Sequence, residues 1–322
     1  MSEMAEFARQ LHERREKQRA RMLLPVDYPA KTDTLHDVRA VIFDVYGTLV
    51  DYWCDEFSEK GKKEAVLLKA FSEVADHFGL VECLTQVNNA DAPEKTLHDF
   101  YHGLITLQHE QAHRKGVAYP EIIIEEIWEV ILTILKRHGY EPPLAGGEKL
   151  RDYARKIAWY YNFSALGRTL YPGVVAALEG LKTKNILTGI VSNAQFYTPI
   201  DLTLLIRDQS NGRFEDIFEL FDVDLTFFSY EYRVAKPDKL LFRKLYDALY
   251  EYQILPEQTV FVGNDLLIDI RAAQEAGMKT ALFTGDEKST FLHDLGGRIE
   301  PDITFTQWTD LVAKLSFHTE GN

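Results

Sequence analysis

Side chains that can do chemistry follow four predicted strands of this chain. The carboxylate of Asp44 comes directly after the apolar run Ala40–Phe43, which is typical of a buried parallel strand. The hydroxyl of Ser192 ends the second predicted strand, and the ammonium of Lys236 follows the third. The polar residues after the fourth are Asn264, Asp265 and Asp269. Because the carboxyl ends of parallel strands lie at one edge of a sheet, we expect these groups to lie together.

The first of these side chains, Asp44, is placed to act as a nucleophile. A carboxylate at the carboxyl end of a central strand lies where open α/β sheets bind ligands, and it can form a covalent intermediate with an electrophile. Gly47 permits a sharp turn after the strand, and Thr48 adds a hydroxyl beside it. Taken alone, this stretch could equally contain an Asp that caps a helix, since short motifs recur by chance.

The remaining predicted elements form the sheet that positions these residues. From Tyr171 onward, helices and strands alternate, and this order is typical of a parallel, doubly wound α/β sheet. The later predicted strands are Ile186–Ser192, Leu225–Ser229, Gln258–Gly263, Thr280–Thr284 and Ile303–Phe305. The predicted helices around them are Pro172–Leu181, Asp238–Tyr250, Asp269–Gly277 and Trp308–Leu315.

A long insertion, residues 52–170, separates Asp44 from the rest of the predicted sheet. Apolar residues recur at helical spacing in four of its stretches, Ala65–Phe78, Leu97–Gly116, Pro120–Gly139 and Leu150–Tyr161. We therefore predict an all-helical domain and interpret it as a lid that excludes water from the site. The alternative is a helical subdomain that only adds hydrophobic core.

These elements divide the chain into three parts. Residues 1–37 form a polar leader with a predicted helix at Ala5–Met22. Residues 38–51 and 171–322 form the catalytic core, a doubly wound parallel sheet with its helices, and residues 52–170 form the helical insertion after the first strand.

The composition is ordinary for a soluble globular protein, with 322 residues, 46% hydrophobic and 27% charged. A net charge of −14 argues against a broad nucleic-acid footprint, so an anionic substrate would need a local positive centre. The two cysteines are too few for a disulfide scaffold, and no apolar run reaches transmembrane length or forms a signal core. We expect a cytoplasmic monomer or homodimer that binds a small, anionic molecule rather than nucleic acid or a membrane.

Together, the four groups resemble the haloacid dehalogenase-like (HAD) hydrolase superfamily. The stretch Asp44–Leu49 is similar to its first motif, Asp-x-x-Gly-Thr-Leu, and Ser192 to the Ser/Thr of the second. The Lys-Pro of the third motif appears at Lys236-Pro237, and the acidic fourth motif at Gly263–Asp269. Any one of these motifs is weak, but four in order, each after a predicted strand, are specific.

The resemblance implies an enzyme with a Rossmann-like core, and the insertion falls where the superfamily places a helical C1-type cap. By this resemblance Asp44 is the nucleophile, and Lys236 neutralises charge in the transition state. Ser192 and nearby backbone N–H groups hold the oxygens of the transferring group. The residues expected to bind the substrate are Tyr46, Gly47, Thr48 and Asn193.

The resemblance also implies a Mg²⁺ ion at the edge of the sheet. The expected ligands are the carboxylates of Asp44, Asp265 and Asp269 and the backbone carbonyl of Tyr46, with Asn264 as an alternative to Asp265. Mg²⁺ prefers oxygen ligands of this kind. Three carboxylates close together cannot all stay ionised without such a cation.

The chain departs from the superfamily pattern at two positions. Phosphatases of the superfamily usually carry a second Asp two residues after the nucleophile as general acid and base, and here Tyr46 stands there, as in the 2-haloacid dehalogenase branch. The fourth motif often reads Gly-Asp, whereas here it reads Gly263-Asn264-Asp265. The first acid is therefore either displaced to Asp265 or replaced by Asn264.

Three hypotheses follow. The retained acids favour Mg²⁺-dependent phosphoryl hydrolysis of a small organic phosphate with a good leaving group, such as an acyl, enol or aryl phosphate. Tyr46 favours a metal-independent 2-haloacid dehalogenase. A catalytically silent HAD-fold regulator or binding protein is the third, and the joint presence of Asp44, Ser192 and Lys236 argues against it.

Overall fold

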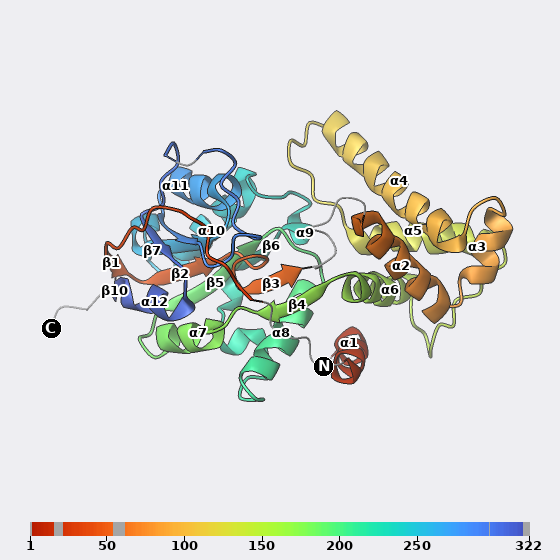
Figure 1. The fold of residues 1–322 in the computed structure, drawn as a ribbon, viewed down its shortest axis with the longest axis horizontal. Coiled ribbons are helices and arrows are strands. Elements are labelled where there is room, and N and C mark those ends of the chain that lie inside the picture. The colour runs from red at the N-terminus through yellow and green to blue at the C-terminus, as the bar shows by residue number, and fades with distance from the viewer. Residues whose placement is uncertain (1, 16–21, 54–61, 296, 318–322) are drawn as a thin grey trace. The chain divides into compact units, whose positions relative to one another are not determined.

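The computed structural model describes residues 2–15, 22–53, 62–295 and 297–317 (Figure 1). The chain forms two compact units. The first, here called the helical unit, contains Tyr52–Arg168 together with the N-terminal segment that carries helix α1 (Glu3–Arg14). The second, the sheet unit, contains the rest of the chain, and all the motif residues belong to it.

The sheet unit is built on six parallel strands in the order β6-β5-β2-β7-β8-β9 (Figure 1). Their bounds are β2 Ala40–Phe43, β5 Leu187–Ser192, β6 Thr226–Phe228, β7 Thr259–Gly263, β8 Lys279–Phe283 and β9 Ile303–Phe305. The chain runs outward from β2 to β6, then returns to β7 on the other side of β2. Open α/β sheets bind ligands at the carboxyl ends of the strands where the order reverses, so the end of β2 is the expected site.

Strand β2 lies in the interior of the sheet, between β5 and β7, and its side chains pack on both faces. Side chains alternate between the faces of a strand. Ile42 belongs to an apolar cluster with Leu241 and Leu245, whereas the Phe43 ring lies 5.8 Å from that of Trp308. The residues of β2 are fully buried, which explains their continuous apolar run. The predicted doubly wound α/β fold is confirmed.

Helices cover both faces of this sheet (Figure 1). Those of the sheet unit are α7 Val174–Lys182, α8 Thr198–Gln209, α9 Ser229–Tyr232, α10 Lys239–Glu251, α11 Ala272–Glu275 and α12 Trp308–Ala313. A π-helical turn, Leu266–Arg271, precedes α11, where the sequence predicts the start of an ordinary helix. Helix α8 is absent from the sequence-based prediction, although Pro199 in its first turn and the apolar residues after it are usual signals of a helix start.

The described part of the helical unit contains five helices besides α1. They are α2 Lys62–His77, α3 Val81–Val87, α4 Pro93–Arg114, α5 Ile124–Arg137 and α6 Leu150–Ala165. Its core is aromatic: the rings of Phe71 and Tyr161 stack at 4.4 Å, and Trp128 and Trp159 are fully buried. Apolar side chains at helical spacing bury one stripe of each helix, and this packing explains the periodicity in the sequence.

Two pairs of short strands lie outside the predicted elements. Strand β1 (Leu35–Val38) pairs in parallel with β10 (Leu315–Phe317). Strand β3 (Val50–Trp53) pairs with β4 (Gly167–Leu170), and the boundary between the two units falls within these two segments. Among its described residues, the insertion thus has a short strand at each end and helices joined by loops between them.

The leader differs from its prediction. The helix expected over Ala5–Met22 ends at Arg14, and residues 16–21 of that prediction lie outside the described part of the chain. Helix α1 packs within the helical unit through Phe7, whose ring lies 6.0 Å from that of Trp159. The later residues join the sheet unit, where the Val26 N–H donates to the Thr284 carbonyl. The leader is therefore shared between the units.

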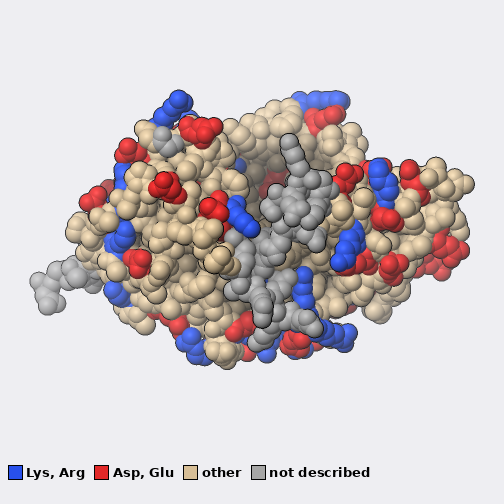
Figure 2. Space-filling view, viewed as in Figure 1, with Lys and Arg blue, Asp and Glu red and all other residues tan. Residues whose placement is uncertain are grey.

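Charged side chains of both signs are scattered over the face drawn in Figure 2. Charged side chains one helical turn apart form ion pairs on the helices, such as Lys95 with Asp99 and Arg271 with Glu275. No described helix is both long and apolar enough to cross a membrane.

Candidate active site

The turn after β2 fixes the position of Asp44. The Asp44 N–H donates to the Val262 carbonyl of β7, which continues the ladder one residue past the strand. The chain then folds back, because the N–H groups of Thr48, Leu49 and Val50 all lie within 3.2 Å of the Val45 carbonyl. Asp44 is 6% exposed, so its carboxylate is nearly buried at the carboxyl end of β2.

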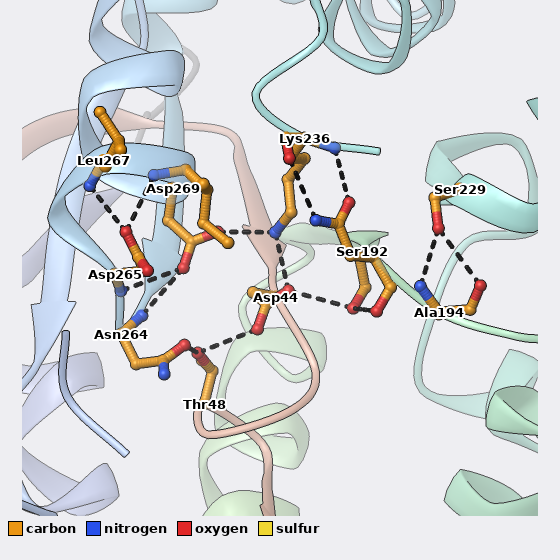
Figure 3. A network of polar contacts seen from close by, with 12 residues as sticks. Asp44, Thr48, Ser192, Ala194, Ser229, Lys236, Asn264, Asp265, Leu267 and Asp269 are labelled. Atoms are coloured by element: carbon orange, nitrogen blue, oxygen red, sulfur yellow. Dashed lines mark hydrogen bonds and ion pairs between the residues drawn. The ribbon is translucent and has the colours of Figure 1, made fainter. Parts of the chain in front are cut away.

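Lys236 and Ser192 both contact the same oxygen of Asp44 (Figure 3). The Lys236 Nζ lies 2.7 Å from Asp44 Oδ1, and the Ser192 hydroxyl donates to that oxygen at 3.0 Å. The other oxygen, Oδ2, is 3.5 Å from the Thr48 hydroxyl, at the outer limit for a hydrogen bond. Asp44 Oδ1 is therefore held tightly and Oδ2 loosely.

Lys236 lies between two carboxylates. Its Nζ is 2.6 Å from Asp269 Oδ1 as well as 2.7 Å from Asp44, and its side chain is fully buried. Burial alone lowers the pKa of Lys236, but the charges of Asp269 and Asp44 outweigh it and leave the pKa above its ordinary value. Burial raises the pKa of Asp269, and the nearby Asp44 adds to this while Lys236 opposes it. One ammonium thus stabilises two buried carboxylates.

The Asn193 side chain bonds the backbone of Lys236. Its Nδ2 donates to the Lys236 carbonyl at 3.1 Å, and its Oδ1 accepts the Lys236 N–H at 2.6 Å. Both ends of the amide are therefore engaged by the backbone of Lys236. These contacts orient Lys236, and the predicted role of Asn193 in substrate binding stays a prediction. Ser229, which no sequence motif singles out, holds the chain just after Ser192. Its hydroxyl accepts the Ala194 N–H and donates to the Ala194 carbonyl.

Asp269 organises the loop after β7. Its Oδ2 accepts the N–H groups of Asn264 and Asp265, each at 3.1 Å. The loop is so tight that a Cβ on Gly263 would lie 2.4 Å from the Cβ of Asp269, which only glycine permits. Asp269 is therefore bonded to Lys236 and to its own loop.

The carboxylate of Asp265 is bonded within its own loop and to His293. Its Oδ1 accepts the N–H groups of Leu267 and Ile268, and its Oδ2 lies 2.7 Å from His293 Nε2. Among the described residues, no three His, Cys, Asp or Glu side chains are placed to share a metal ion. The expected cluster of Asp44, Asp265 and Asp269 is therefore not formed, because two of its members bond elsewhere. Nothing in the sequence singles out His293 as the partner of Asp265.

The side chain of Asn264, the alternative to Asp265 in the fourth motif, contacts the turn after β2. The Thr48 hydroxyl donates to Asn264 Oδ1 at 2.9 Å, and the same hydroxyl is the one beside Asp44 Oδ2. Asn264 is 3% exposed. The structure thus brings together the side chains of Asp44, Thr48, Ser192, Lys236, Asn264 and Asp269, whereas Asp265 joins this network through its backbone N–H, which donates to Asp269 (Figure 3).

The side chain of Tyr46 is bonded to the start of α8. Its hydroxyl lies 2.9 Å from the Thr198 hydroxyl, which also accepts the Gln195 N–H at 3.3 Å. In the phosphatase pattern the corresponding Asp is a general acid. A phenol hydrogen-bonded to Thr198 replaces it here.

Gly47 is required by two separate features of the site. Its φ of +83° is a left-handed conformation that favours glycine, and a Cβ there would lie 2.3 Å from Asn264 Nδ2. We expect Gly47→Ala to lower the free energy of unfolding by about 2–5 kcal/mol, from backbone strain and overpacking together. Urea unfolding followed by circular dichroism measures this change.

Gly212→Ala is the matched control for this prediction. Gly212 has a similar φ of +75°, but a Cβ there would meet no heavy atom of the described residues within 4 Å, so only the backbone strain remains. The free energy of unfolding is expected to fall by about 1–3 kcal/mol more in the Gly47 variant than in the control. Equal losses in the two variants would show that Asn264 does not crowd Gly47.

The fold is an open α/β sheet with a carboxylate, an ammonium and a hydroxyl in contact at the end of its central strand. A sequence profile described as haloacid dehalogenase-like hydrolase matches residues 38–277. The chain belongs to this family, and the family and enzyme class expected from the motifs are confirmed.

Two curated proteins show what the chain is similar to. An uncharacterized protein of Saccharomyces cerevisiae is 24% identical over 186 residues, 54% of this chain and 55% of that protein. A glyceraldehyde 3-phosphate phosphatase of Pyrococcus furiosus is 26% identical over 191 residues, 56% of this chain and 70% of that protein. The match thus spans about half the length of the yeast relative.

A solved structure agrees on the fold. The 2-haloacid dehalogenase of Pseudomonas syringae superposes with a TM-score of 0.51 at 16% sequence identity, over 86% of this chain and 97% of that one. At this level of identity the likeness supports the fold alone.

Proposed function

We propose that this enzyme hydrolyses its substrate through a covalent intermediate on Asp44. The observation that supports this most directly is the pairing of Asp44 Oδ1 with Lys236 at 2.7 Å and Ser192 at 3.0 Å. A buried carboxylate stays ionised only where opposite charge and hydrogen bonds compensate its desolvation. An ionised, oriented carboxylate at a ligand-binding edge is suited to nucleophilic attack.

We infer that the substrate is a small organic phosphate. The Lys236 ammonium and the Ser192 hydroxyl offer donors to an anionic group beside Asp44. The phosphatase of Pyrococcus furiosus, similar to more than half of this chain, fits the same inference. The net charge of −14 makes these local donors important, because the protein as a whole repels anions.

The donor set fits a minimal Mg²⁺ site. Asp44 Oδ2 and Asn264 Oδ1 both lie around the Thr48 hydroxyl, at 3.5 and 2.9 Å. Mg²⁺ is often held by one or two carboxylates and completed by waters and substrate phosphate oxygens. We propose that Asp44, Asn264 and the Tyr46 backbone carbonyl would hold the ion, with Asp269 positioning Lys236 and the backbone of Asn264. The bound ion would supply positive charge to the phosphate oxygens.

The reaction then has two displacements. An Asp44 oxygen attacks phosphorus, and the bond from phosphorus to the leaving oxygen breaks with its electron pair going to that oxygen. Water then attacks phosphorus, and the bond from phosphorus to the Asp44 oxygen breaks with its electron pair returning to the carboxylate. Inorganic phosphate leaves with the water oxygen, and a water proton passes to the phosphate or to solvent. With Tyr46 in place of the usual acid, the first step forgoes a general-acid contribution of about 10²–10⁴-fold. We therefore expect acyl, enol and aryl phosphates, whose leaving groups need little protonation, to react best.

A panel of acyl, enol, aryl and alkyl phosphates tests this proposal, each assayed with Mg²⁺ and with a chelator. The expected result is phosphate release that depends on Mg²⁺ and is fastest for acyl and aryl phosphates. Turnover that the chelator leaves unchanged would contradict phosphoryl transfer by this site.

A second candidate is metal-independent dehalogenation of a 2-haloacid. It is favoured by Tyr46 and by the engagement of Asp265 and Asp269 with His293 and Lys236, which leaves Asp44 without a second acid to share a cation. In that reaction an Asp44 oxygen attacks carbon, and halide departs with the electron pair of the carbon–halogen bond. Water then attacks the carboxyl carbon of the resulting Asp44 ester, the ester bond breaks, and the 2-hydroxy acid leaves with the carboxylate restored. Halide release from 2-chloropropionate in the presence of chelator supports this candidate, and no release at any pH eliminates it.

We also propose that the helical unit is the cap of this enzyme, since it is inserted directly after the nucleophile strand. Binding of Mg²⁺ and orthovanadate, which resembles a transferring phosphoryl group, should then slow tryptic cleavage of the helical unit in the wild-type protein. Equal cleavage rates with and without vanadate, under conditions where vanadate inhibits turnover, would argue for a subdomain that only adds core.

A further inference from the structure

The segment Asp286–His293, which follows β8, contacts the loop that carries Asn264 through several hydrogen bonds, one of them from the Leu266 N–H to the Phe291 carbonyl at 3.0 Å. The Asn264 Nδ2 donates to the Ser289 carbonyl, and the Phe291 N–H donates to the Asn264 carbonyl at 2.9 Å. His293 bonds Asp265 at 2.7 Å. Ser289, Phe291 and His293 take no direct part in the proposed reaction. Their contacts act on it through the position of Asn264.

These contacts fix which way the Asn264 amide faces. Its Nδ2 donates to the Ser289 carbonyl, which only accepts, so its Oδ1 faces the Thr48 hydroxyl on the side of Asp44. A rotated amide, or a carboxylate at this position, would set an oxygen against the Ser289 carbonyl. Since Asn264 is 3% exposed, bulk water cannot relieve that contact.

Buried groups anchor Ser289 in turn. The Tyr171 hydroxyl lies 2.7 Å from Asp286 Oδ2 and 3.1 Å from Ser289 Oγ. Asp286 also accepts the Lys288 N–H on its side chain and the Ser289 and Thr290 N–H groups on its carbonyl. Tyr171 and Asp286 are 1% and 0% exposed. Burial raises the pKa of Tyr171, so the phenol remains a donor across the physiological range.

We propose that Tyr171, Asp286 and the Ser289 carbonyl form a positioning network that selects an amide at residue 264 and holds its oxygen toward Asp44. This inference rests on the proposed function, in which Asn264 faces the reacting group. The network also explains why this chain has Gly263-Asn264 where the family often has Gly-Asp. The Ser289 carbonyl needs a hydrogen-bond donor at residue 264, and an aspartate would not supply one. Tyr171 and Asp286 are positioning residues, because they act through Asn264.

Tyr171→Phe tests the network, because it removes one hydroxyl and keeps the ring. The loss of one buried hydrogen bond is expected to speed hydrogen exchange of the Asn264 side-chain amide by about 10-fold, measured by NMR. The kcat for the best phosphate of the panel should fall by about 10-fold with KM changed less than about 2-fold, since the change displaces a group at the reacting centre.

Tyr140→Phe is the matched control. Tyr140 is also buried, and its hydroxyl donates to the Phe78 carbonyl at 2.8 Å within the helical unit. The two variants should lose comparable melting temperature, but only Tyr171→Phe should change the Asn264 amide or kcat. Unchanged exchange in Tyr171→Phe would overturn the inference, whatever happens to kcat.

Asn264→Asp tests the same selection without touching Tyr171. This variant keeps the shape of the side chain but loses the donor to Ser289, so its melting temperature should fall and its turnover should not rise. An unchanged melting temperature with equal or higher turnover would overturn the inference. Amide exchange and melting are measured without substrate, so they decide the inference even if phosphates prove not to be the substrates.

Discussion

Asp44→Asn is expected to lower kcat by about 10⁴-fold or more, because the variant lacks the oxygen nucleophile that forms the covalent intermediate. The amide can still accept from Lys236 and Ser192, so the fold should be kept. Single-turnover assays with the best phosphate of the panel measure the loss, and urea unfolding checks the stability.

Asp224→Asn is the control for Asp44→Asn. Asp224 belongs to the same unit, is exposed, and makes a surface contact with the Tyr252 hydroxyl at 3.1 Å. Its kcat should equal that of the wild type. If Asp44→Asn retained more than about one hundredth of the wild-type kcat, Asp44 would act as an electrostatic group and not as the nucleophile.

Lys236→Met is expected to cost about 3–5 kcal/mol of the free energy of unfolding, because it leaves two buried carboxylates without their shared cation. The ammonium is 2.7 Å from Asp44 and 2.6 Å from Asp269, and the side chain is fully buried. Turnover should also be lost, since the variant places no positive charge at this position beside the transferring group. Denaturant unfolding and steady-state assays measure the two effects separately.

The double variant Lys236→Met/Asp269→Asn separates charge from packing. It removes one of the two negative charges, so part of the lost stability should return while turnover stays low. If Lys236→Met were as stable as the wild type, the ion pairs described for Lys236 would not contribute to folding. If the double variant were no more stable than the single one, the cost would come from packing.

The convergence of Asp44, Ser192 and Lys236 could be predicted because it depends on topology. Residues that follow parallel strands must reach the same edge of the sheet, whatever their side chains do afterwards. The helices of the insertion could be found for a similar reason, since a buried stripe imposes its period on the sequence. The seven-residue α3, Val81–Val87, was missed because it is too short to show that period.

The directions of the side chains could not be predicted. Asp265 follows a strand as Asp44 does, yet it turns to His293, which lies far along the chain. Asn193 stands beside Ser192 but bonds the backbone of Lys236. In both cases the partner is a tertiary neighbour, and sequence spacing carries no information about it. The pairing of β1 with β10 could not be predicted either, because strands this short are stable only through tertiary packing.

The most direct test of the nucleophile is to trap the intermediate on Asp44. The enzyme is mixed with acetyl phosphate and Mg²⁺, quenched in acid during turnover, and digested for mass spectrometry. We predict one added phosphoryl group on the peptide that contains Asp44, and none in Asp44→Asn. Steady phosphate release with no modification of that peptide, together with an active Asp44→Asn variant, would contradict a covalent intermediate on this residue.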